Sequence, residues 1–150
     1  MLRTFIAALA ATAAAAAGTS AGPKLEGEYA FLSTALKDGE PACIERWLFE
    51  DGVQTVESGE EVARLHFRTE TDADGLNWLV RTLIETNGKP DCTGSSAPTP
   101  PGPQPESRIY FLVRNKGSVV VCPPPSRTED GTPFIGDCWG EATPVAKAMR

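Results

Sequence analysis

The stretch that decides the fold is CIERWLFEDGVQTVESGEEVARLHFRTET, residues 43–71. It contains three segments of strand length separated by turns: residues 43–50, 53–57 and 62–71. Asp51-Gly52 between two such segments favours a two-residue hairpin, because both central residues of that turn need a positive φ angle. Over residues 64–68 apolar side chains alternate with polar ones, as a half-buried strand requires. The stretch therefore predicts antiparallel strands joined by hairpins.

The same pattern continues on both sides of this stretch. Further turn signals are Asp38-Gly39, Asp74-Gly75, Asn87-Gly88, Lys116-Gly117 and Asp130-Gly131. Eight strands are expected, near residues 28–36, 43–50, 53–57, 62–71, 76–86, 108–115, 118–122 and 134–143. Strands that must bury one shared face close into a barrel or pack as a sandwich. The expected fold class is all-β, an antiparallel meander closed into a small barrel, with a β-sandwich as the alternative.

The first 21 residues have the order of a secretory signal peptide. Arg3 is the only charge among the first 23 residues, and an alanine-rich apolar run from Phe5 to Ala17 follows it. Small residues favour cleavage after Ala21, with residues 15–17 as an alternative site. The apolar run is too short to span a bilayer. The sequence thus predicts export to a periplasm or to the cell exterior, and one mature domain over residues 22–150.

The chain is acidic, with a formal net charge of −6. Without residues 1–21, which contain one basic and no acidic side chain, 13 basic and 20 acidic side chains remain. Nucleic acids and anionic lipid surfaces bind best to a basic protein surface, so neither is expected as the main partner.

The four cysteines of the chain are Cys43, Cys92, Cys122 and Cys138. An even number in an exported protein predicts disulfides. The chain lacks Cys-x-x-Cys spacing and has a single histidine, which argues against a metal site. Among the three pairings we favour Cys122 with Cys138, which brackets a proline-rich excursion between two late strands, and therefore Cys43 with Cys92. Loop-closure entropy gives roughly 3 and 4 kcal/mol of stabilisation at most.

Residues 89–106 interrupt the strand pattern. Six prolines lie there among glycine, serine and threonine, which indicates an exposed loop, partly of polyproline II conformation. The Pro98-x-x-Pro101 spacing matches an SH3 ligand, but a surface loop tethered at Cys92 suits an exported protein better.

Two features resemble reactive sites. Residues 70–75 place acids at alternate positions before a glycine, like the first half of a calcium loop, but Arg81 stands where the closing glutamate should be. His66 is the only histidine, and no nucleophile motif accompanies it. We therefore expect no catalytic residue, no metal ion and no cofactor, and a protein that is not an enzyme.

The aromatic residues fall almost entirely on the expected strands, often two apart and so on one face. They either fill the core or, for a few of them, line a cavity for an apolar ligand, which an eight-stranded barrel is wide enough to hold. The residues expected to line such a cavity are Trp47, Phe67, Trp78 and Phe111.

Two short motifs carry a resemblance to a known family. Residues 25–29, LEGEY, resemble the Gly-x-Trp entry of lipocalin-like (calycin) barrels, with Tyr29 at the tryptophan position. The pattern Trp47-x-Phe49-x-Asp51-Gly52-Val53 is similar to a strand and hairpin of small bacterial lipocalin-like domains. The resemblance implies a meander barrel with an interior site and names no ligand.

Three functions are compatible with these features. The first is an exported, non-enzymatic binding protein for a small apolar ligand. The second is an inhibitor or immunity-type protein that blocks an exported enzyme through residues 89–106 or 123–133. The third, ranked last, is a small hydrolase, which would need His66 or a close carboxylate pair in a cleft.

Overall fold

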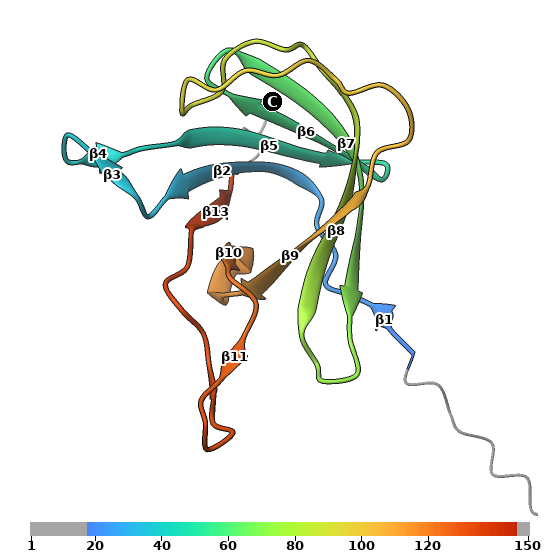
Figure 1. The fold of residues 1–150 in the computed structure, drawn as a ribbon, viewed down its shortest axis with the longest axis vertical. Coiled ribbons are helices and arrows are strands. Elements are labelled where there is room, and N and C mark those ends of the chain that lie inside the picture. Colours follow the sequence, from blue (N-terminus) through green and yellow to red (C-terminus); the bar gives the residue numbers. More distant parts are fainter. Residues whose placement is uncertain (1–17, 147–150) are drawn as a thin grey trace, which may run out of the picture.

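The computed structural model describes residues 18–146, and eight of their strands form a closed antiparallel barrel (Figure 1). The barrel strands are β2 (Gly27–Ser33), β5 (Ile44–Glu50), β6 (Val53–Ser58), β7 (Glu61–Thr71), β8 (Asn77–Thr86), β9 (Glu106–Val113), β10 (Val119–Cys122) and β13 (Gly140–Pro144). Each pairs with the next one in this order, and β13 pairs with β2 to close the barrel. The predicted meander barrel is confirmed, and the β-sandwich alternative does not hold.

The hairpin between β5 and β6 forms where the sequence predicts it. The two strands pair from Glu50 opposite Val53 to Glu45 opposite Ser58. Asp51 and Gly52 both have positive φ angles, 49° and 76°, as the short turn between them requires. The signal in the sequence therefore fixes both the turn and the register of these strands.

The last predicted strand, residues 134–143, is wrong in its first half. Phe134 belongs to a small hairpin of β11 (Ser126–Arg127) and β12 (Pro133–Phe134), and β13 begins only at Gly140. The Asp130-Gly131 turn closes this hairpin on itself, with Gly131 N–H donating to the Thr128 carbonyl oxygen. The chain then returns to the end of β10 before it enters the barrel as β13.

The disulfides pair Cys43 with Cys92 and Cys122 with Cys138, as predicted. Both lie at the end of the barrel where β5 begins and β10 ends, which we call the disulfide end. The opposite end holds the short β5–β6 and β7–β8 turns, and we call it the turn end. Disulfides persist in oxidising compartments, so the two bridges indicate an extracytoplasmic environment.

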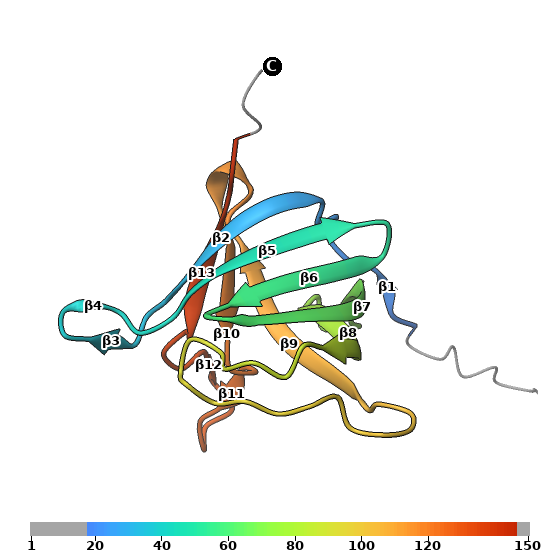
Figure 2. The same cartoon turned by 90° about the horizontal axis from the view of Figure 1, so that it is seen from above.

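Besides β11 and β12, four short elements of the described chain lie outside the barrel. β1 (Ser20–Ala21) pairs with the end of β7, and β3 (Leu36–Lys37) pairs with β4 (Glu40–Pro41) in a hairpin that projects from the barrel (Figure 2). A 3₁₀ turn, η1 (Asn115–Gly117), joins β9 to β10. Most of the predicted signal peptide, residues 1–17, lies outside the described residues. Within residues 18–146 no helix is long and apolar enough to cross a membrane.

Apolar side chains form two clusters, one inside the barrel and one outside it. The inner cluster holds Leu25, Tyr29, Phe31, Trp47, Phe49, Leu79, Phe111, Val119, Val121 and Ala142, with Val56, Phe67 and Ile109 against it. The outer cluster covers part of β8, β9 and β10, and comprises Tyr110, Val120 and Cys122, with Leu76, Trp78, Leu112 and Cys138 against them. This second cluster explains why β10 is buried on both faces.

Candidate functional site in the barrel interior

The structure brings together three of the four aromatic residues expected to line a cavity. Trp47 and Phe111 belong to the inner cluster and Phe67 packs against it. Trp78 belongs to the outer cluster, because its neighbour Leu79 takes the inward position on β8. The Trp78 indole N–H donates a hydrogen bond of 2.8 Å to Asp72 Oδ2. Trp78 is therefore not an interior residue.

The interior rings pack against one another. Phe31 and Trp47 are stacked with their centroids 4.7 Å apart and their planes at 9°. Phe49 makes edge contacts with Tyr29 at 5.5 Å and with Phe67 at 4.9 Å. Phe49 lies next to the β5–β6 turn, whereas Phe31 lies opposite Glu45, nearer the disulfide end, so the rings extend along the barrel interior.

Two polar side chains, those of Glu45 and Ser58, take inward positions on the side of the disulfide end. Glu45 shares the inward face of β5 with Trp47 and lies opposite Ser58, which is 3 % exposed. The Trp47 Nε1–H donates to Glu45 Oε2 at 2.7 Å. Glu45 Oε1 lies 3.6 Å from Cys92 Sγ. Because a disulfide sulfur carries no proton, this is a contact and not a hydrogen bond.

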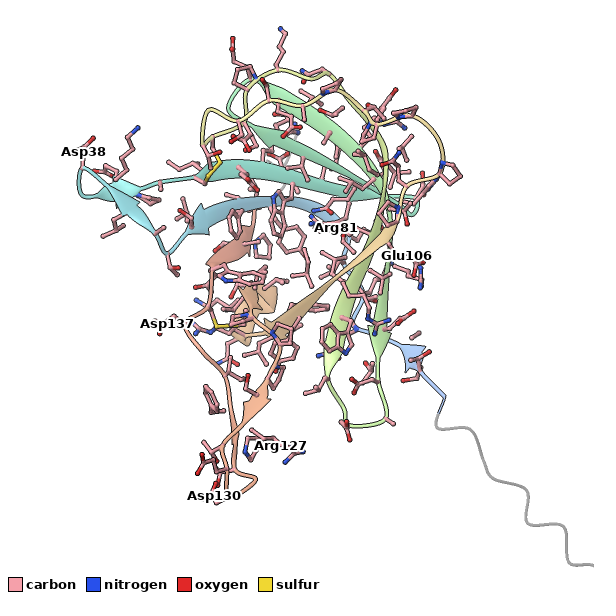
Figure 3. The ribbon with its side chains drawn as sticks, viewed as in Figure 1. Asp38, Arg81, Glu106, Arg127, Asp130 and Asp137 are labelled. Carbon is pink, nitrogen blue, oxygen red and sulfur yellow. A yellow bond between two sulfur atoms is a disulfide. The ribbon has the colours of Figure 1, made fainter. Side chains whose placement is uncertain are left out.

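Arg81 on β8 also points into the barrel (Figure 3). It lies opposite Phe67 of β7 and Ser107 of β9, between the inward positions of Leu79 and Leu83. Its Nε is buried and has no hydrogen-bond partner. Burial lowers the pKa of the Arg81 guanidinium, and the negative charge of Glu45 partly opposes that shift.

Gln54 is the second polar residue buried without partners. It lies on β6 opposite Phe49 and Leu65, is fully buried, and neither its Oε1 nor its Nε2 has a hydrogen-bond partner. Neither Arg81 nor Gln54 is predicted as a site residue from the sequence. The available signal was the alternation on their strands, which puts Arg81 on one face with Leu79 and Leu83.

The residues considered for catalysis and for calcium lie on the outer surface. His66 is exposed on the outward face of β7. Glu70 forms ion pairs with Arg68 and with Arg108, at 2.8 and 2.9 Å. Asp72 Oδ1 accepts backbone N–H bonds within its own turn, and its Oδ2 accepts the Trp78 indole. These acids are thus engaged by neighbouring protein groups.

The proline-rich segment is tied across the disulfide end (Figure 1). The Cys92 N–H donates to Ser58 Oγ at 3.1 Å, and the Glu60 N–H donates to the Pro90 carbonyl oxygen at 2.9 Å. A Cβ atom on Gly59 would lie 2.7 Å from the Asp91 carbonyl carbon, so only glycine permits this approach. Residues 90–92 at the start of the predicted loop therefore pack against the β6–β7 turn, and Cys92 lies next to Glu45.

A pocket of about 360 Å³ lies on the outside of the barrel, between β2, β5 and the chain after β13. Acidic side chains dominate its lining: Glu26, Glu28, Glu50 and Asp51. None of the four aromatic residues predicted to contact a ligand lines this pocket, and Phe49 reaches it from the inner cluster.

Comparison with protein-family models, with curated proteins and with solved structures gives no match to this chain.

Proposed function

We propose that this protein is an exported, non-enzymatic binding protein whose barrel takes a small, mainly apolar ligand. One observation carries the proposal: Phe49 and Phe67, whose rings are in edge contact, lie opposite Gln54 and Arg81, which have buried polar side-chain atoms without a partner in the described chain. Binding sites for small molecules combine these two features, an apolar lining and a few polar groups that orient the ligand. The resemblance to lipocalin-like barrels belongs to this proposal.

The position of the titratable groups supports binding over catalysis. His66 and the acids of residues 70–74 lie on the outer surface, away from Trp47 and Arg81. Inside the barrel, Glu45 is held by the Trp47 indole. A hydrolase would need a positioned acid–base pair next to a substrate cleft.

The test is a titration with N-phenyl-1-naphthylamine, an uncharged apolar dye whose fluorescence rises in an apolar site. The mature protein should bind one dye molecule saturably. Trp47→Phe should weaken binding about tenfold, because the stacked indole is lost. Trp78→Phe is the matched control and should leave the affinity unchanged, provided that both variants melt like the wild type. Unsaturable fluorescence, or equal effects of the two substitutions, would contradict the proposal.

A second function, an inhibitor of an exported enzyme, is favoured by the excursion between Cys122 and Cys138. This excursion and the residue after it expose three large apolar side chains: Phe134, Ile135 and Trp139, at 49, 42 and 52 %. Exposed aromatic anchors on a disulfide-held loop are typical of protein-binding surfaces. An exported enzyme that wild type inhibits and a Phe134→Ser/Trp139→Ser variant does not would establish this function. A Leu36→Ser control that inhibits as strongly as the wild type would show that the loss of inhibition is specific to this surface.

A further inference from the structure

Arg81 differs from every other arginine among residues 18–146. Arg46, Arg64, Arg68, Arg108 and Arg114 each lie within 4.0 Å of a carboxylate, and Arg127 donates to a backbone carbonyl oxygen. In the described part of the chain the Arg81 side chain has neither an ion pair within that distance nor a hydrogen bond. It is also the arginine that points into the barrel (Figure 3).

A charged guanidinium without a partner is unfavourable in the interior of a barrel. The group keeps its charge at all physiological pH values, and it offers five N–H donors. Burying a charge without a partner costs far more free energy than burying one that is paired. The nearest interior acid, Glu45, accepts the Trp47 indole and lies beyond ion-pair distance of Arg81. The buried Nε–H of Arg81 therefore faces the interior without an acceptor.

Gln54 is an independent observation that points to the same region. Its β7 partner is Leu65, and the β7 partner of Arg81 is Phe67, the next inward position along that strand. The two polar side chains thus occupy neighbouring rows of the interior. The Gln54 amide, fully buried and unpartnered, adds two donors and one acceptor to that space.

We infer that the ligand carries a carboxylate head group, which Arg81 binds inside the barrel. This inference rests on the proposed binding function and adds the class of the ligand. A carboxylate accepts two parallel N–H hydrogen bonds from a guanidinium, and the Arg81 guanidinium has no ion-pair partner in the described chain. The Gln54 amide in the neighbouring row supplies a further donor. The apolar body of the ligand would contact the rings of Phe67 and Trp47 beside these groups.

The experiment compares octanoate with octanol, which has the same chain and no charge, in displacing N-phenyl-1-naphthylamine from the mature protein. Octanoate should displace the dye at a concentration about tenfold lower than octanol. Arg81→Met should remove this preference, so that octanoate and octanol displace the dye at similar concentrations. Arg108→Met is the matched control on the outer surface, and it should keep the preference.

The outcomes separate the inference from the proposed function. If the dye binds but octanoate displaces it no better than octanol, the head-group inference is wrong and the binding function stands. If the dye does not bind saturably, the proposed function itself fails. The wild-type comparison needs no variant, so it decides the question even where Arg81→Met does not fold. Arg81→Lys, which keeps the charge and loses the planar guanidinium, should retain only part of the preference.

Discussion

The indole N–H of Trp47 donates to the carboxylate of Glu45, two residues earlier on the same inward face of β5, over 2.7 Å. Glu45 is therefore the acid that holds an interior ring and whose negative charge partly offsets the effect of burial on the Arg81 guanidinium. This relationship links the aromatic and polar parts of the interior.

Glu45→Ala should destabilise the protein by about 1–3 kcal/mol, because it leaves the Trp47 donor unpaired and removes the charge that offsets Arg81. Urea unfolding measures the change. Glu57→Ala is the control, since its ion pair with Arg46 is exposed and should contribute less than about 1 kcal/mol. Equal losses in the two variants would show that Glu45 has no special role.

Gln54→Leu should stabilise the unliganded protein by about 1–3 kcal/mol, because a leucine of similar size removes two buried polar atoms that have no partner. Gln104→Leu should not stabilise it, since the Gln104 amide donates to the carbonyl oxygens of Pro100 and Gly102. Thermal melts of the two variants provide the comparison. A loss of stability in Gln54→Leu would mean that its amide is already satisfied.

Gly140→Ala should destabilise the barrel by about 1–3 kcal/mol, the range for an overpacked core. A Cβ atom there would collide with the Phe31 ring and would lie 2.6 Å from the Leu32 carbonyl oxygen. Gly136→Ala is the matched control, because its Cβ would meet Pro123 at an ordinary 3.5 Å. If both variants melt alike, the contact between β13 and β2 is looser than described.

Acid should weaken the fold partly through Asp72. The Trp78 indole and then the Leu76 backbone N–H hold the pKa of Asp72 below its usual value. A lowered pKa gives stability that is present above the unfolded pKa, about 3.9, and is lost as the pH falls through the folded value. The melting temperature of Asp72→Asn should therefore fall less than that of the wild type below about pH 4. Asp74→Asn, whose exposed side chain makes none of these bonds, should follow the wild-type curve.

The hairpins and the disulfides could be predicted from the sequence because each depends on only a few residues. Asp51-Gly52 needs positive φ angles, and four cysteines leave few pairings. The inward face of β8 could not be predicted in the same way. Trp78 and Val80 alternate with Leu79 and Leu83, so both faces are apolar and either could be the inner one.

The polar interior was missed for a related reason. The outer cluster covers one side of β8 and β9, and this cover depends on the chain around Cys138, far away in the sequence. The alternation of side chains along β8 does not reveal the outer cluster. In the sequence, Arg81 is therefore notable only because it stands where a calcium loop would have its closing glutamate. Gln54 follows a turn and precedes β-branched residues, where an exposed glutamine is the ordinary expectation.

The measurement that tests the central claim most directly is a ¹⁵N–¹H spectrum of the three tryptophan indole groups during titration with N-phenyl-1-naphthylamine. Trp47 lies inside the barrel, whereas Trp78 lies in the outer cluster and Trp139 is exposed. Trp→Phe variants assign the three signals. Interior binding predicts that the Trp47 signal shifts and saturates at one dye per chain while the other two stay in place. A shift of Trp78 or Trp139 with an unchanged Trp47 signal would contradict the account.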